Sequence, residues 1–253
     1  MHEVHPEVDA YRPLSRLAAI GLLLGLASML AWLAPLFWLV PIVALVVNLA
    51  ALWHLVRRAP QAAGRTLAGL GLALAIACGV GAPTVDSIRL AQLRAEGRQF
   101  ALEWFGYLAA DQPERAFQLT LGPGQRWELD DRLWRVYQAH PSRMNDLERF
   151  VDDSTIRVLL ALGEEAQVRY YKTEDHVQVA RTDRFLDVYA VTFRREGRPT
   201  TFFVLMKLAC THIPGEPRHW QVLQVGGGYR PLGWPADAAA GTVAATESSP
   251  APR

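Results

Sequence analysis

The feature that most constrains the fold is a stretch of 40 residues, Leu17 to Val56, without a single Asp, Glu, Lys or Arg. A second such stretch of 20 residues runs from Thr66 to Val85. A helix needs about 20 apolar residues to cross about 30 Å of hydrocarbon, and about 40 residues extend about 60 Å as a helix. The first stretch therefore predicts a helical hairpin in a membrane, and the second predicts a third apolar helix. These lengths argue against a fully soluble protein.

The hairpin is expected to break at residues 34–35 or 40–41. The proline at the second position of each pair lacks a backbone donor and disfavours helix in the residue before it. The third span is predicted over residues 67–82, which are rich in Gly and Ala. The sequence thus predicts a polar N-terminal segment over residues 1–13 and a transmembrane helical domain over residues 14–83.

Arginines near the span ends predict the orientation, since basic residues favour the cytoplasmic side of a membrane. Arg12 and Arg16 precede the first span, and Arg57, Arg58 and Arg65 lie between the second and third spans. Three spans then place the large C-terminal domain outside the cytoplasm. If the third segment lies only in the interface, the domain returns to the cytoplasm. A cleaved signal peptide is a competing interpretation, which the length of the apolar stretch disfavours.

Small and polar residues within the predicted spans indicate what these helices do. Gly21 and Gly25 form a GxxxG pair, which permits close contact between helices. We expect this pair to pack within one three-helix bundle; the alternative is a homo-oligomer formed through the same face. The spans contain no charged residue, only Asn48 and His54, whereas transporters and proton pumps place ionisable groups at mid-membrane depth. The pattern favours an anchor.

The predicted membrane part resembles a known family. The resemblance rests on the run Gly-Leu-Leu-Leu-Gly-Leu-Ala-Ser from Gly21, the proline-broken hairpin, the Arg-Arg loop and the run Gly-Arg-Thr-Leu-Ala-Gly-Leu-Gly-Leu-Ala-Leu-Ala from Gly64. Together they look like the small bacterial membrane domain catalogued as domain of unknown function 4190, over residues 14–83. The resemblance implies no activity. The basic residues comprise 24 Arg and 2 Lys, which suggests a GC-rich bacterial genome, so we expect a multi-pass protein of the bacterial inner membrane.

Residues 87–235 have the composition of a globular domain, with helices first and strands after Gly163. Asp111 and Asp131 are expected to cap helices, and Asp153 or Ser154 the last helix. Runs rich in Val, Tyr, Phe and Thr with a period of two then predict strands. These runs cover residues 166–172, 176–180, 186–195, 200–209 and 220–225. Helices followed by a curved antiparallel sheet predict an α+β domain.

The order of these elements is similar, over residues 88–230, to the cone-shaped fold named after nuclear transport factor 2. The likeness rests on a long first helix, short helices and a meander of strands, and it carries no sequence motif. It implies a cone between helices and sheet that can hold a pocket. The remaining segment, residues 236–253, is rich in Ala, Thr, Ser and Pro and is predicted to be disordered.

Aromatic side chains are the best candidates for a binding site, because a small-ligand pocket is largely apolar with a few polar groups. The predicted pocket residues are Trp104, Tyr137, His140 and Tyr189; the alternative is that these rings fill the core. No catalytic residue, metal ligand or cofactor is predicted. The histidines lack metal-binding spacing, and Cys210 has no second thiol near it in the sequence.

Charge excludes one class of partner, and the remaining pattern leaves three functions open. With 26 basic and 25 acidic residues, the chain has no net field to attract nucleic acid. The expected partners are the lipid bilayer and a small ligand or a partner protein. The function predicted first is a ligand- or protein-binding domain held at the membrane surface. The alternatives are a membrane-anchored enzyme with its active site in the cone and a structural, homo-oligomeric membrane component.

Overall fold

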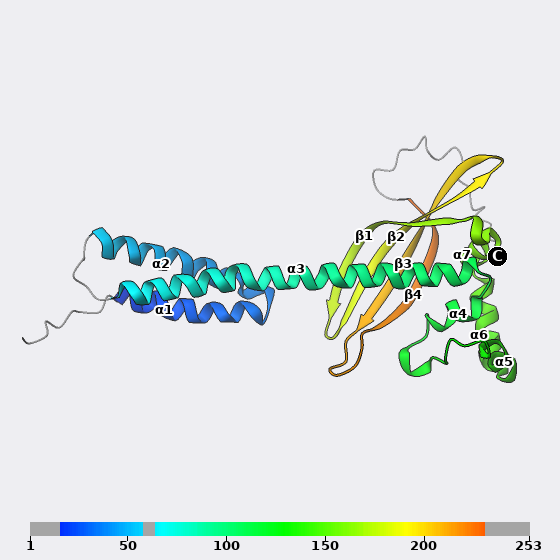
Figure 1. The fold of residues 1–253 in the computed structure, drawn as a ribbon, viewed down its shortest axis with the longest axis horizontal. Coiled ribbons are helices and arrows are strands. Elements are labelled where there is room, and N and C mark those ends of the chain that lie inside the picture. Colours follow the sequence, from blue (N-terminus) through cyan, green and yellow to red (C-terminus); the bar gives the residue numbers. More distant parts are fainter. Residues whose placement is uncertain (1–15, 58–63, 231–253) are drawn as a thin grey trace, which may run out of the picture. The chain divides into compact units, whose positions relative to one another are not determined.

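The computed structural model describes residues 16–57 and 64–230 (Figure 1). The predicted polar segment 1–13 and the predicted disordered tail 236–253 lie outside the described residues. The chain divides into two compact units, residues 1–92 and residues 93–253. We call them the helical unit and the α+β unit and describe each by itself.

The helical unit contains two short 3₁₀ turns between its first helices. Its elements are α1 (Arg16–Ala27), η1 (Ser28–Trp32), η2 (Pro35–Trp38), α2 (Leu39–Arg57) and the first part of α3 (Arg65–Ala109). The chain breaks at Ala34, which is extended (φ −159°, ψ 149°) ahead of Pro35. The predicted break at residues 34–35 is confirmed. Pro41 does not break the chain, because it lies in the first turn of α2, where its missing N–H would have no helical partner.

Two of the three apolar segments form helices long and apolar enough to cross a membrane within the described residues, Leu36–His54 and Arg65–Ala109. The first segment is shorter and covers Arg16–Trp32. It leaves regular α-helical geometry after Ala27, where the Ser28 hydroxyl donates to the Leu24 carbonyl at 2.9 Å. The expectation of three full-length spans is therefore wrong for the first segment.

The helix that carries the third apolar segment does not end near residue 83. Pro83 lies inside α3, which continues without interruption into the α+β unit. Two hydroxyls bond to helix carbonyls around the proline: Thr84 donates to Val80 at 2.6 Å and Ser87 to Pro83 at 2.7 Å. The boundary between the units falls after Gln92, later than the boundary at residues 83–87 expected from composition.

Small residues form the interior of the helical unit, and large apolar residues form its surface. The buried positions include Ala18, Gly21, Gly25, Ser28, Ala44, Asn48, Ala51, Ala68, Ala75 and Cys78. The exposed positions include Leu23, Leu33, Leu36, Leu39, Ile42, Val46, Val56, Leu70 and Val80. A protein folded in water buries its large apolar side chains, so this arrangement is the reverse of a soluble core.

In the α+β unit, short helices follow the end of α3. They are α4 (Pro113–Gln118), α5 (Leu133–Ala139), α6 (Pro141–Asp152) and α7 (Ser154–Leu162), with the 3₁₀ turns η3 (Pro123–Gln125) and η4 (Gly163–Glu165). Asp153 caps α7 as predicted, accepting hydrogen bonds from two backbone N–H groups. The caps predicted at Asp111 and Asp131 are wrong. Asp111 has a φ of 55°, which is not a cap conformation, and α5 begins only after Arg132.

Four antiparallel strands follow in the order β1-β2-β3-β4, which confirms the α+β class. They are β1 (Gln167–Val179), β2 (Thr182–Arg195), β3 (Arg198–Thr211) and β4 (His219–Tyr229). Two of the five predicted strands are one, because β1 passes through irregularities near Tyr170 and Thr173 without ending. The hairpin at Glu196-Gly197 forms as expected, with both residues at positive φ.

The C-terminal part of α3 packs on one face of the sheet (Figure 1). Trp104, Phe105 and Leu108 are buried on this helix. Phe105 lies 5.3 Å from the Tyr189 ring on β2, measured between ring centroids. Gly97 lets the helix approach the Trp220 ring, since a Cβ at Gly97 would lie 2.9 Å from that ring. The edge strand β4 also contacts the short helices and their loops, through Val222 with Leu119 and Gly227 with Thr155.

Candidate functional site

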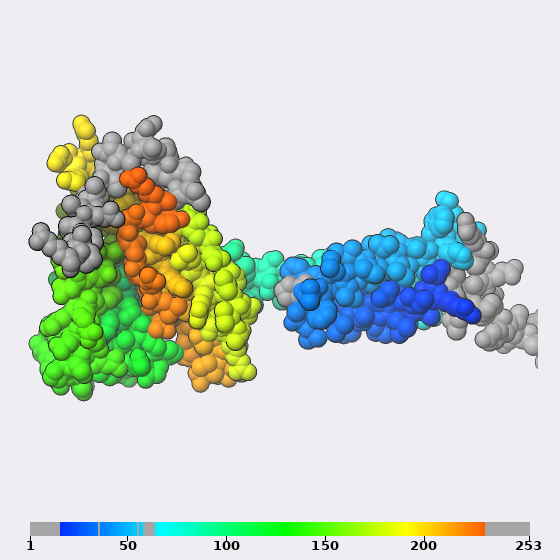
Figure 2. All heavy atoms as spheres, turned by 180° about the vertical axis from the view of Figure 1, so that it is seen from behind, coloured from blue at the N-terminus to red at the C-terminus, as the bar shows by residue number. Residues whose placement is uncertain are grey.

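A groove of about 530 Å³ lies between the short helices and β4. Figure 2 shows β4, in orange, at the surface beside the green helical segments. The groove is lined by Phe117, Thr120, Leu121, Asp146, Arg149, Phe150, Asp153, Ile156 and residues 222–225. Its apolar residues are aromatic and branched, and its polar residues come mainly from α6 and the start of α7. Polar and apolar groups thus line the groove in similar measure, so it can contact both kinds of side chain.

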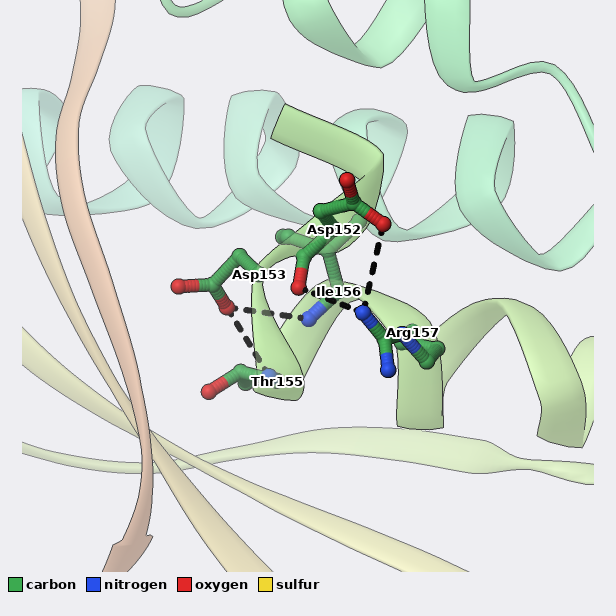
Figure 3. Close-up of polar contacts among 5 residues, drawn as sticks. All are labelled: Asp152, Asp153, Thr155, Ile156 and Arg157. Atoms are coloured by element: carbon green, nitrogen blue, oxygen red, sulfur yellow. Dashed lines mark hydrogen bonds and ion pairs between the residues drawn. The ribbon is translucent and has the colours of Figure 1, made fainter. Parts of the chain in front are cut away.

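On the helical wall of the groove, the carboxylate of Asp153 uses only one of its two oxygens in hydrogen bonds. Asp153 Oδ1 accepts the N–H of Thr155 at 2.8 Å and that of Ile156 at 3.2 Å. Figure 3 shows its other oxygen directed away from these bonds. The neighbouring Asp146 is already paired, since Arg149 Nη2 lies 2.8 Å from its Oδ1. Asp153 is therefore the lining carboxylate without a cationic partner among the described residues.

The strand wall of the groove is held in place from outside the sheet at both ends. Arg126 Nη2 donates to the Trp220 carbonyl, and the Val222 N–H donates to the Leu119 carbonyl at 3.0 Å. At the other end, the Gly227 N–H donates to Thr155 Oγ1 at 2.9 Å. These contacts bond one backbone group each of Trp220, Val222 and Gly227 along the edge of β4.

A buried network of hydrogen bonds holds the loop between α4 and α5 in place beside β4. Gln118 is fully buried and donates to the Tyr137 hydroxyl at 2.7 Å, while its Oε1 accepts the Trp127 N–H at 2.8 Å. Burial raises the pKa of Tyr137 to about 12, so this hydroxyl stays protonated at physiological pH. Both polar ends of Gln118 are satisfied, and the loop between α4 and α5 is fixed.

A second polar cluster lies inside the unit, between α3 and the first two strands. Asp187 on β2 is buried and accepts a hydrogen bond from the Thr173 hydroxyl at 2.6 Å. Burial raises the pKa of the Asp187 carboxyl, while Thr173 and the charges of Arg98 and Arg94 lower it. The Arg98 guanidinium lies 3.7 Å over the Tyr170 ring. Asp187 lines neither the groove beside β4 nor the shallower one around Phe100.

Asp187→Asn is expected to stabilise the protein at neutral pH. With its pKa raised, the native carboxyl holds its proton more tightly than the unfolded chain, so stability falls as the pH rises above the ordinary value of about 4. The amide keeps an acceptor for Thr173 and removes the buried charge. The melting temperature at pH 7.5 should rise by a few degrees. The decrease in melting temperature between acidic and neutral pH should be smaller in Asp187→Asn than in the wild type. Thermal unfolding of the full chain, with exposed Asp175→Asn as the control, checks both effects.

The four predicted pocket residues do not line the groove. Trp104 and Tyr189 are fully buried against α3 and the sheet, and burial together with the Asp187 charge raises the pKa of Tyr189. Tyr137 is buried in the Gln118 network, and exposed His140 bonds the Val136 carbonyl through Nδ1 at 2.8 Å. The geometry thus places three of the rings in the core, which is the alternative stated for them.

The predicted packing pair, Gly21 and Gly25, lies inside the helical unit. Asn48 Nδ2 donates to the Gly21 carbonyl at 2.9 Å, and a Cβ at Gly25 would lie 2.7 Å from the Gly71 Cα. The face that carries the GxxxG pair is occupied within the chain. Homo-oligomer formation through that face stays a prediction from the sequence.

Sequence reasoning missed most of the groove residues. Asp153 was identified only as a helix cap, and Arg126 and residues 222–225 were not singled out. The irregular pairing between Val222 and Gln224 has no turn residue to mark it. The one available signal was Asp153 itself, because a capping carboxylate uses one oxygen and leaves the other free.

Within residues 16–57 and 64–230, no three His, Cys, Asp or Glu side chains gather as a metal site. No known protein-family model matches the sequence, and neither a curated protein nor a solved structure matches it. The resemblances to domain of unknown function 4190 and to the nuclear-transport-factor-2 cone therefore remain expectations from the sequence.

Proposed function

We propose that the protein is a membrane-anchored binding module: the helical unit sits in a bacterial inner membrane, and the α+β unit binds a ligand or partner protein in the groove beside β4. The observation that carries the anchoring is the reversed distribution of side chains in the helical unit. Large Leu, Ile and Val side chains face outward, while Gly, Ala, Ser and Asn face inward. Lipid solvates such a surface, and small residues allow the close helix packing that stabilises membrane bundles.

Basic residues support an orientation with the α+β unit outside the cytoplasm. Arg16 begins α1, Arg57 ends α2 and Arg65 begins α3. Under the positive-inside rule these helix ends belong on the cytoplasmic side. Because α3 starts on that side, the part of the chain that follows its apolar stretch is then extracytoplasmic.

The anchoring is tested by extraction and labelling. The full chain should stay with the membrane pellet after alkaline carbonate washing. A cysteine placed at exposed Gln138 should react with a membrane-impermeant maleimide in intact spheroplasts. The native cysteines Cys78 and Cys210 are buried and serve as the background. Release of the protein by carbonate would contradict the anchoring, and labelling only after lysis would place the α+β unit in the cytoplasm.

Binding in the groove is tested by photocrosslinking in the native membrane. A benzoylphenylalanine at Leu223, which lines the groove, should give a discrete adduct on irradiation. The matched control is Val177, an exposed β1 residue of similar accessibility that does not line the groove. Adducts at both positions, or at neither, would contradict a binding site at β4.

A further inference from the structure

We propose that the occupant of the groove is an extended peptide segment of a partner protein, which pairs with the edge of β4 at Val225 and places a basic side chain at Asp153. This inference rests on the proposed function, because it names the class of partner for the same groove. It is carried by the hydrogen-bonding pattern of the β4 edge together with the charge of the opposite wall.

The pairing of β3 and β4 fixes which β4 residues direct their backbone groups out of the sheet. Successive residues of an antiparallel strand alternate between bonding the neighbouring strand and pointing away from it. Gly227 points away, because its N–H bonds Thr155. Val225 stands two positions earlier in an unbroken stretch of the β3 pairing, opposite Met206. Its N–H and C=O therefore also point outward, into the groove that it lines.

Among the β4 residues that point outward, Val225 is the one with neither its N–H nor its C=O bonded by a described residue. Before the irregularity at Leu223, the outward Trp220 carbonyl accepts from Arg126, and the outward Val222 N–H donates to Leu119. After it, Gly227 is taken by Thr155. No described residue bonds the outward groups of Val225. Proteins normally cover or charge such strand edges, because an open edge pairs with another chain. At Val225, which lines the groove, both outward groups are open, and an added strand is the ligand that bonds this donor and this acceptor together.

The charge of Asp153 favours a basic side chain on the added peptide strand. Of the two lining aspartates, Asp146 is paired with Arg149, which also lines the groove, and Asp153 has one oxygen without a partner among the described residues. A lysine or arginine of the peptide would supply a charge-assisted hydrogen bond at that oxygen. Side chains of an extended segment alternate between two faces. One face of the peptide then meets the apolar lining at Phe150 and Ile156, and the other carries basic residues.

The probe is a fluorescein-labelled hexapeptide of alternating Lys and Val, measured by anisotropy against the full chain in a non-ionic detergent. Two control peptides are used. One carries Glu in place of Lys, and the other has N-methylated Val amides that cannot donate a hydrogen bond. The Lys peptide should bind the wild-type protein at least about tenfold more tightly than either control peptide. The Glu peptide loses the charge-assisted hydrogen bond, and the methylated peptide loses the main-chain hydrogen bonds.

Two protein variants test the two contacts. Asp153→Asn keeps the cap of α7, since Asn is as good a cap as Asp, but removes the charge and should weaken the Lys peptide about tenfold. Its control is Asp152→Asn, which alters the adjacent aspartate that pairs with Arg157 rather than lining the groove (Figure 3). Val225→Pro removes the outward N–H, which would donate to a peptide carbonyl, and should weaken the Lys peptide. The preference for the unmethylated peptide should persist, because the Val225 carbonyl still accepts the peptide N–H.

The outcomes separate this inference from the proposed function. Equal binding of the methylated and unmethylated peptides would overturn strand pairing, even if Val225→Pro does not fold, while a Leu223 adduct would still support a binding groove. Absence of Lys-peptide binding, or equal binding of the Glu peptide, would overturn the basic-peptide assignment. If deletion of residues 236–253 raises the affinity tenfold or more, or if the peptide dissociates a dimer in native mass spectrometry, the groove is filled by this chain itself and the inference falls.

Discussion

Gly71→Ala is expected to destabilise the helical unit by about 1–3 kcal/mol, the usual cost of overpacking a closely packed contact. A Cβ at this position would lie 2.6 Å from Asn48 Oδ1 and 2.8 Å from the Gly21 carbonyl oxygen. The second of these atoms is backbone, so it can move only if α1 moves. Asn48 would have to turn away, and its Nδ2 would lose the bonds to the Gly21 and Ala44 carbonyls.

Helix α3, which carries Gly71, also provides a matched control at Gly69. Gly69 has no atom within 4 Å of the Cβ that alanine would add, so Gly69→Ala should be neutral or should stabilise by up to about 1 kcal/mol through helix propensity. Cys78 is buried in this unit and reports its unfolding. In a Cys210→Ala background, a thiol-reactive dye should label Cys78 at a lower temperature in Gly71→Ala than in Gly69→Ala. Equal labelling temperatures would mean that the three helices do not meet at Gly71.

How far the sequence predicts each feature depends on how local its cause is. The break before Pro35, the cap at Asp153 and the hairpin at Glu196-Gly197 were predictable, because a few neighbouring residues determine each. The bond from Asn48 to Gly21 was not, although both residues were noted, because it depends on how two helices approach. The boundary expected at residues 83–87 was wrong, because the composition changes there while α3 continues through Pro83.

The groove is the feature with the least local cause, and the sequence did not predict it. Its walls meet through contacts between residues far apart in the sequence, such as Gly227 with Thr155 and Arg126 with Trp220. The aromatic rings gave a stronger compositional signal, yet Trp104, Tyr137 and Tyr189 are buried in the interior. Composition identifies which side chains are large enough to fill a core or line a pocket, and only the packing of distant segments decides between the two.

Arg126→Ala is expected to have the largest effect in the α+β unit, at least about 3 kcal/mol, because hydrogen bonds to a charged group contribute about 1.5–3 kcal/mol each. The guanidinium bonds three backbone carbonyls: Nε donates to Leu121 at 3.0 Å, and Nη2 donates to Leu119 at 3.3 Å and to Trp220. Burial lowers the pKa of Arg126, as expected for a guanidinium removed from water. Alanine would remove this donor from the Leu121 and Trp220 carbonyls and leave the Leu119 carbonyl with the Val222 N–H alone, which loosens the loop from β4.

The measurement is thermal unfolding together with hydrogen exchange at the Val222 amide, whose bond to Leu119 depends on the loop staying in place. Exchange there should speed up in Arg126→Ala and stay unchanged in Arg135→Ala, which removes an exposed arginine from α5. Arg126→Lys separates charge from geometry. A lysine keeps the charge, but its single ammonium cannot reproduce the planar fork that bonds carbonyls from two directions, so it should recover less than half of the lost stability. Full recovery by lysine would show that the positive charge alone, and not the fork, holds the loop against β4.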